Sequence, residues 1–242
     1  MRYVVFSFVS LVTYVALSAP TAAAQPLSPI RGIVVASSSG GTDLEVHNES
    51  DHDVTALIVT ARLRNEVGTV SETKTYLDAL QQSAFRGIQP RGVLRLPLAR
   101  KGVFAEPSIK AAVFGDGQTF GDAQWVARIQ RYREADLAIM NDIINRLSVT
   151  LQGRTSTDDL IQQCKMTVTL SKNQRIVLHG DRDLDGDIAR YTKIRTEALY
   201  TMIIQAAERP ASAISSQQGL SALSRIMLEK RDRLAGIIHP QQ

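Results

Sequence analysis

The chain has 242 residues, of which 28 are Lys or Arg and 24 are Asp or Glu. The charge is close to balanced, and the basic residues do not form the stripe with stacking aromatics that is typical of a nucleic-acid-binding protein, so we expect no nucleic-acid partner. Cys164 is the only cysteine, which excludes an intramolecular disulfide. We expect it to be a buried structural residue; a thiol that pairs between chains or acts as a nucleophile is the alternative.

The first 24 residues have the pattern of an export signal. Arg2 precedes an apolar run over residues 3–17, Pro20 then breaks the helix, and residues 22–24 supply the small side chains that a signal peptidase accepts. We expect cleavage after Ala24 and a mature protein in the periplasm or outside the cell. The apolar run is shorter than the roughly 20 residues that cross a bilayer, so we expect no integral membrane span after cleavage.

Residues 31–121 have the pattern of an antiparallel β-sandwich. Turn residues interrupt this segment about every ten positions, and the stretches between them are short and rich in β-branched residues. Residues 57–64 alternate between an apolar and a more polar set, which is the period of a strand. Asp116 and Gly117 favour a hairpin, because both residues tolerate the positive φ of a tight turn. We expect six or seven short strands in two sheets of immunoglobulin-like type.

Two segments of this sandwich resemble a known class of exported domain. Residues 46–50, followed by residues 54–59, resemble the opening of FxLYD-like and related bacterial immunoglobulin-like modules, in which a strand ends in an Asn-x-Ser turn. Residues 75–78 repeat part of the family signature, whose Phe is missing here. The resemblance implies an extracytoplasmic accessory or interaction module with no catalytic residues to carry over.

After residue 121 the apolar spacing changes to threes and fours. This period predicts a linking amphipathic helix over residues 122–150, with Asp122 as its N-terminal cap. Its wetter side is expected to carry four charged residues: Arg128, Arg131, Arg133 and Asp136.

Residues 151–242 are predicted to form an α-helical domain, a small bundle. Helical periodicity covers residues 188–206 and 216–237, whereas residues 154–178 fit either a helix, which we favour, or a hairpin. Three tyrosines occupy core-like positions on the predicted helices: Tyr132, Tyr191 and Tyr200.

One acidic loop concentrates candidate metal ligands. The residues in question are Asp181, Asp183, Asp185 and Asp187, and with Gly186 they resemble EF-hand and dockerin-type calcium loops. The pattern departs from those loops at its twelfth position, Thr192, which offers no bidentate carboxylate. The main alternative is a solvated loop in which Asp185 or Asp187 caps a helix that begins at Ile188. A transition-metal site with His179 and Asp181 is the third reading.

These patterns favour an exported, non-enzymatic binding or interaction protein of unknown ligand, with a protein or an envelope component as its partner. Calcium is the only cofactor that the sequence offers, which gives a calcium-stabilised accessory protein as one alternative. A hydrolase of unrecognised type is the other, with carboxylates from Asp181, Asp183 and Asp185. A hydrolase would need a concave pocket beside these carboxylates, and a convex loop would contradict it.

Overall fold

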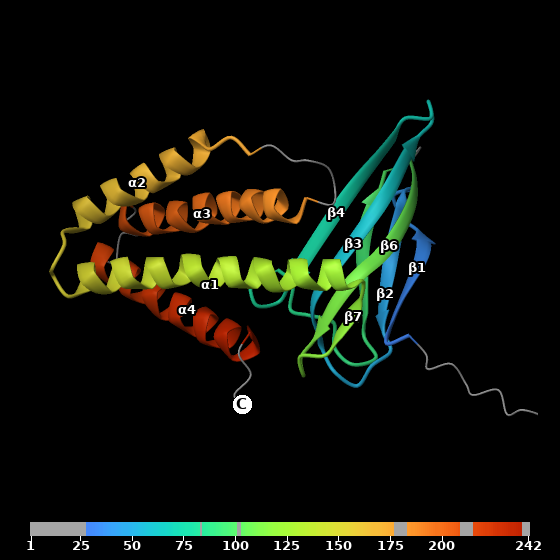
Figure 1. Cartoon of the computed structure of the whole chain (residues 1–242), viewed down its shortest axis with the longest axis horizontal. Helices are drawn as coiled ribbons and strands as arrows, with labels where there is room; N and C mark the ends of the chain where they lie inside the picture. Colours follow the sequence, from blue (N-terminus) through green and yellow to red (C-terminus); the bar gives the residue numbers. More distant parts are fainter. Residues whose placement is uncertain (1–27, 83, 101–102, 177–182, 209–214, 239–242) are drawn as a thin grey trace, which may run out of the picture.

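The computed structural model describes residues 28–82, 84–100, 103–176, 183–208 and 215–238. In this part of the chain seven β-strands are followed by four α-helices, and the helices extend away from one side of the strands (Figure 1). The predicted order, β and then α, is confirmed. The export signal lies outside the described residues, and the domain boundaries stay predictions. None of the described helices combines the length and the apolar character that a bilayer span requires.

The strands form two antiparallel sheets. The first sheet has the order β1-β2-β5, with strands β1 (Ile30–Ala36), β2 (Thr42–Asn48) and β5 (Val93–Ala99). The second has the order β4-β3-β6-β7, with strands β4 (Val70–Asp78), β3 (Val54–Asn65), β6 (Val103–Phe114) and β7 (Thr119–Gly121). The predicted hairpin joins β6 to β7, and Gly117 has a φ of 86° in its turn, which glycine adopts without strain.

Strand β3 buries side chains on both of its faces. Leu57 and Val59 belong to the core that the two sheets share. Ile58 points the other way and packs against Ile129 of the first helix. The alternation that predicts a strand is therefore confirmed, but the predicted polar face is buried at Ile58 and Thr60 and becomes exposed only at Arg62.

The first helix, α1 (Ala123–Leu151), connects the sheets to the bundle as predicted. Asp122 caps it, because its Oδ1 accepts a hydrogen bond of 2.8 Å from the amide of Gln124. The first half of α1 packs on the second sheet, and its second half enters the core of the helical part.

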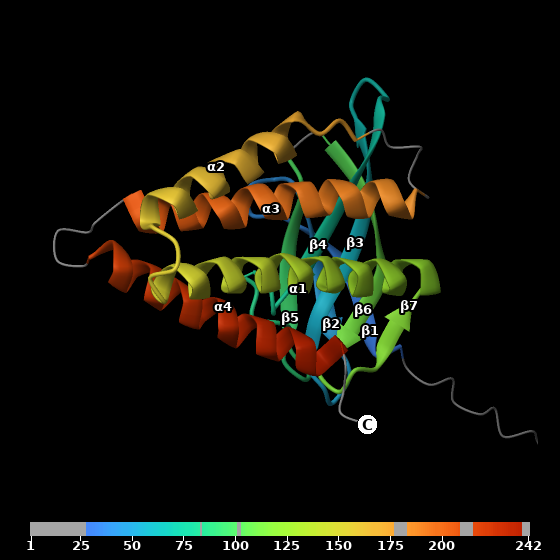
Figure 2. The same cartoon turned by 60° about the vertical axis from the view of Figure 1, so that its left-hand side comes forward.

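Three further helices complete the bundle: α2 (Thr157–Asn173), α3 (Leu184–Glu208) and α4 (Ser216–Ile238). Helix α2 packs along α3, whereas α4 packs along α1 (Figure 2). Residues 157–173 are thus helical, as favoured over a hairpin, and Ser156 caps them by accepting a 3.0 Å bond from the amide of Asp159. Cys164 is buried in the bundle core as expected, and burial raises the pKa of its thiol to about 11.

The prediction that the charged residues of α1 lie on a solvent-facing side is wrong for most of them. Arg128, Arg133 and Asp136 are buried rather than solvated, with exposed fractions of 5%, 3% and 0%. Of the four charged residues predicted on the wetter side, Arg131 is the exposed one. A buried charge is tolerated when an opposite charge pairs with it. Here the pairing groups come from distant parts of the sequence, which periodicity along α1 cannot reveal.

Helices α1 and α3 are joined by three matched contacts, which we call the ladder. Each helix contributes residues spaced by four positions, with the charges reversed between the helices: Arg128 with Asp187, Tyr132 with Tyr191, and Asp136 with Arg195. In the first rung Arg128 Nη1 lies 3.0 Å from Asp187 Oδ2. In the second the centroids of the two tyrosine rings are 4.2 Å apart. In the third rung the guanidinium of Arg195 donates two hydrogen bonds of 2.9 Å to the buried carboxylate of Asp136.

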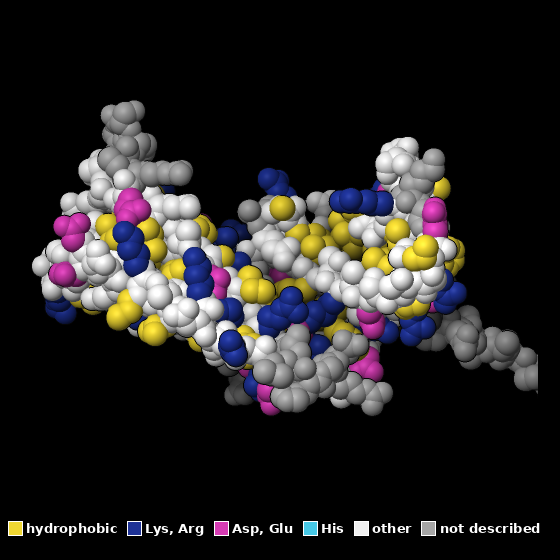
Figure 3. Space-filling view, turned by 90° about the horizontal axis from the view of Figure 1, so that it is seen from above, with side chains coloured by type: hydrophobic (Ala, Val, Ile, Leu, Met, Phe, Trp, Pro, Cys, Tyr) yellow, Lys and Arg dark blue, Asp and Glu magenta, His cyan; other side chains and the backbone are white. Residues whose placement is uncertain are grey.

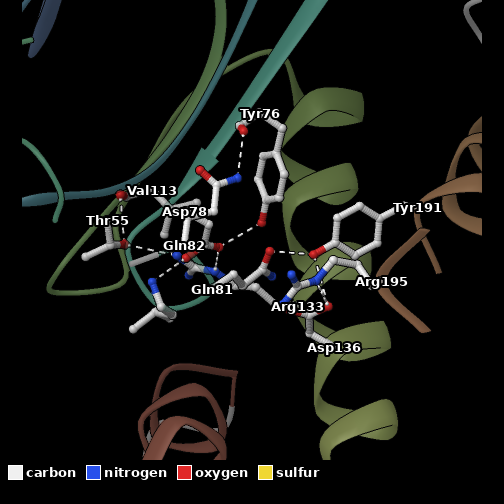
Figure 4. Close-up of polar contacts among 11 residues, drawn as sticks. Thr55, Tyr76, Asp78, Gln81, Gln82, Val113, Arg133, Asp136, Tyr191 and Arg195 are labelled. Carbon is white, nitrogen blue, oxygen red and sulfur yellow. Dashed lines mark hydrogen bonds and ion pairs between the residues drawn. The ribbon is translucent and has the colours of Figure 1, made fainter. Parts of the chain in front are cut away.

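A second set of buried polar contacts ties α1 to the second sheet (Figure 4). Asp78, at the end of β4, is fully buried. Its Oδ2 accepts hydrogen bonds of 2.8 Å from Arg133 Nε and 2.7 Å from the Tyr76 hydroxyl. Its Oδ1 accepts a bond from the amide of Leu80, and Arg133 also donates to Thr55 Oγ1. Every oxygen of this buried carboxylate is therefore satisfied.

We predict that Arg133→Met destabilises the protein by about 3–5 kcal/mol, because it leaves the buried Asp78 carboxylate without its counter-charge. Arg131→Met, two residues away on the same helix and half exposed, should change the free energy of unfolding by less than about 0.5 kcal/mol. Urea denaturation of both variants checks this prediction. Equal stability of the two variants would contradict a structural role for the Asp78–Arg133 pair.

Candidate functional site

A pocket of about 540 Å³ lies where β3 and β4 meet the first turns of α1 and α3. Lys and Arg side chains lie beside hydrophobic ones where the helices meet the strands (Figure 3). The volume is in the range of small-molecule sites, which are mostly apolar with a few convergent polar groups.

Aromatic side chains form much of the pocket wall. They come from the strand and from both helices: Tyr76, Trp125, Tyr132 and Tyr191. The rings contact one another, with centroids of Tyr76 and Tyr132 4.8 Å apart. Burial, reinforced by nearby carboxylates, raises the pKa of Tyr132 and Tyr191, so both hydroxyls stay protonated and can donate hydrogen bonds. These two tyrosines do pack in the protein interior as predicted, but they also line the pocket.

The charged part of the pocket is centred on Asp187, which projects from the first turn of α3. Lys74 of β4 donates a hydrogen bond to Oδ1 of this carboxylate, and the Tyr132 hydroxyl donates one to Oδ2. Arg128 Nη1 also donates to Oδ2, at 3.0 Å. The side chain of Asp187 is 17% exposed, so solvent still reaches it. Three donors from two other elements thus hold one carboxylate of α3.

The environment of Asp187 keeps it ionised. Burial alone would raise the pKa of its carboxyl group, but hydrogen bonds from Lys74 and Tyr132, with the charges of Lys74 and Arg128, outweigh burial and lower the pKa below its usual value. An ionised carboxylate that already accepts three hydrogen bonds is a weak base. Its position therefore favours an electrostatic role over proton transfer.

Arg190 adds a third basic group to the pocket. It lies one turn after Asp187 on α3 and is exposed. Its charge opposes the rise in the pKa of Tyr132, and both residues line the pocket. Within the described part of the chain, no carboxylate forms an ion pair with Arg190.

The structure describes three of the four predicted calcium ligands: Asp183, Asp185 and Asp187. Asp181 lies outside the described residues. Asp183 lines the pocket, and its Oδ1 accepts a 2.8 Å bond from the amide of Gly186 at the start of α3. The predicted capping by Asp185 or Asp187 is therefore wrong, because α3 begins at Leu184 rather than at Ile188.

The other two candidates point to different surroundings. The side chain of Asp185 is 91% exposed and lies 3.8 Å from Arg131, whereas Asp187 is held by the cations of the pocket. Among the described residues, no three His, Cys, Asp or Glu side chains are grouped so that they could hold a metal ion. Calcium binding, to which Asp181 would contribute, stays a prediction.

Sequence reasoning missed Lys74 and the pairing of the buried charges. Lys74 lies in a polar stretch of the sequence that suggests a solvent-exposed strand, and it is not part of any recognised motif. The ladder did leave a signal, because residues 128–136 and 187–195 carry charge-reversed triplets around a central tyrosine at the same spacing. Opposite charges at matching intervals on two helices are a pattern that favours side-by-side packing.

We predict that Asp187→Asn destabilises the protein by about 1–3 kcal/mol at pH 7, because three donors lose their charged acceptor. Since the folded protein lowers the pKa of this group, its contribution is present above the unfolded value of 3.8 and is lost as the pH falls through the lower folded value. The difference between parent and variant should therefore shrink below about pH 4.

Urea denaturation of both proteins between pH 3 and 7 measures this difference. Asp185→Asn, two residues away and almost fully exposed, is the matched control and should change the free energy of unfolding by less than about 0.5 kcal/mol at every pH. A loss in Asp187→Asn that stays constant with pH would show that the charge of Asp187 does not stabilise the fold.

Comparison with known proteins gives no match. No protein-family model matches the chain, and neither does any curated protein or solved structure. The chemistry of the pocket is therefore inferred from the groups that line it.

Proposed function

We propose that the chain is an exported, non-enzymatic binding protein that holds a small amphipathic ligand in the pocket between the second sheet and the helices. The observation that carries this proposal is the wall of the pocket, where four aromatic rings surround a few convergent charged groups. Rings supply apolar contact area at little entropic cost, and the charged groups orient the ligand. A free small molecule and an aromatic group of a larger envelope component both fit this description.

An extracytoplasmic location is part of the proposal. Its support is the sequence of residues 1–24, with one basic residue, an apolar run and small residues before the expected cleavage position. We also propose that the strands form an immunoglobulin-like sandwich. The strand order supports this, because strands one, two and five form one sheet and strands four, three, six and seven form the other.

Ligand binding fits the pocket better than hydrolysis does. The concave surface that a hydrolase would need is present beside Asp183 and Asp187. However, Asp183 accepts a hydrogen bond from the first turn of α3, and Asp187 is held ionised by Lys74 and Arg128. Asp187 is therefore not arranged as a general acid, which would need a raised pKa.

The fluorescent dye N-phenyl-1-naphthylamine tests the proposal, because it is neutral, aromatic and small enough for the pocket. We expect saturable binding with quenching of Trp125, the only tryptophan, which lines the pocket. Ile194→Asp should weaken binding by about tenfold, because it removes an apolar contact and places a charge against the dye.

Met202→Asp is the matched control for this variant. Both residues lie on α3 and are comparably exposed, Ile194 at 54% and Met202 at 44%, but only Ile194 lines the pocket. The control should bind the dye as the parent does. A parent that does not bind, or equal losses in both variants, would contradict a ligand site in this pocket.

A further inference from the structure

The described side chains leave a surplus of positive charge in one part of the pocket. Lys74, Arg128 and Arg190 all line this part of the pocket, and Asp187 forms ion pairs with the first two. Arg190 is exposed and forms no ion pair with a described carboxylate. The single negative charge of Asp187 does not balance the three positive charges beside it.

The other two carboxylates of the pocket wall act elsewhere. Asp183 accepts a hydrogen bond from the backbone at the N-terminus of α3, where a negative charge also stabilises the helix dipole. Glu72 of β4 is exposed and lies directly opposite Arg62 in the register of β3 and β4. These two described side chains form no ion pair, but opposite charges directly across neighbouring strands attract, so Arg62 partly compensates the charge of Glu72.

We propose that the ligand of this pocket carries an anionic group, which binds among Lys74, Arg128 and Arg190 while its apolar part lies against the aromatic wall. This inference rests on the proposed function and specifies its ligand class as aromatic or planar molecules that carry a carboxylate, sulfonate or phosphate group. Arginine and lysine recognise such groups through charge-assisted hydrogen bonds. Trp125 stacks on Arg128, with the guanidinium carbon 4.4 Å from the ring centroid, and so holds one of these donors in place.

Asp187 is an internal competitor for the anion of the ligand. It belongs to the first rung of the ladder, which borders the pocket and remains in contact with solvent. The third rung differs, because its carboxylate, Asp136, is fully buried and accepts two hydrogen bonds from the guanidinium of Arg195. At the first rung, the anionic group of a ligand can therefore share the donors of Asp187 or replace Asp187 as their acceptor. The third rung meanwhile keeps α3 packed against α1.

Two dyes that differ only in one anionic group test the inference. These are 8-anilinonaphthalene-1-sulfonate and its neutral parent, N-phenyl-1-naphthylamine. We expect the purified protein to bind the sulfonate at least about tenfold more tightly, as one to two charge-assisted hydrogen bonds would give. Binding of the sulfonate should weaken as the salt concentration rises, whereas binding of the neutral dye should not.

Two variants should change the affinity for the sulfonate in opposite directions. Arg190→Gln removes an exposed basic group and should weaken sulfonate binding by about fivefold to tenfold, with no change for the neutral dye. Asp187→Asn removes the competing negative charge and should strengthen sulfonate binding. Because Arg190 is exposed, its variant keeps the test informative even if Asp187→Asn is poorly folded. Phe104→Ser, an exposed aromatic residue on β6 outside the pocket, is the control for non-specific dye binding.

The outcomes separate the two proposals. If the neutral dye binds as tightly as the sulfonate, or if Arg190→Gln leaves sulfonate binding unchanged, the anionic ligand class is wrong while the pocket remains a binding site. If neither dye binds, the proposed function and this inference are both wrong.

Discussion

The ladder between α1 and α3 is the interaction on which the rest of the architecture depends. Its outer rungs are ion pairs of reversed polarity. If α3 ran in the opposite direction, like charges would face each other, and if it shifted by one turn, charged side chains would face tyrosines. Burying one of these charges without its partner would cost several kcal/mol, which penalises the alternatives. The ladder therefore fixes how α3 lies along α1, and with it the position of Asp187.

The pocket follows from this constraint. Arg133 and Asp78 attach α1 to the end of β4, and the ladder attaches α3 to α1, so a strand and two helices meet at a polar junction. Apolar packing alone would close such a junction. Charged and aromatic side chains that need specific partners keep it open, and Lys74 and Tyr132 then face the same carboxylate. The groups that stabilise the junction are thus also the groups that can contact a ligand.

Much of the fold could be predicted from local sequence, because its causes are local. The alternation in β3, the turn at Asp116 and the cap at Asp122 depend on neighbouring residues, and each is found where the pattern placed it. The charged side of α1 could not be predicted in this way, because Arg133 pairs with Asp78 and Asp136 with Arg195, across long stretches of sequence. Residue type and spacing identify a charged side chain but not its partner.

We infer that the polar junction makes the sheets and the helices one cooperative unit. Equilibrium unfolding in urea tests it most directly when two probes are followed on the same samples: the fluorescence of Trp125, which reports on the pocket at the junction, and circular dichroism at 222 nm, which reports on the helices. We expect both probes to give one transition with the same midpoint. Two separate transitions, with helical signal lost while Trp125 keeps its native fluorescence, would contradict it.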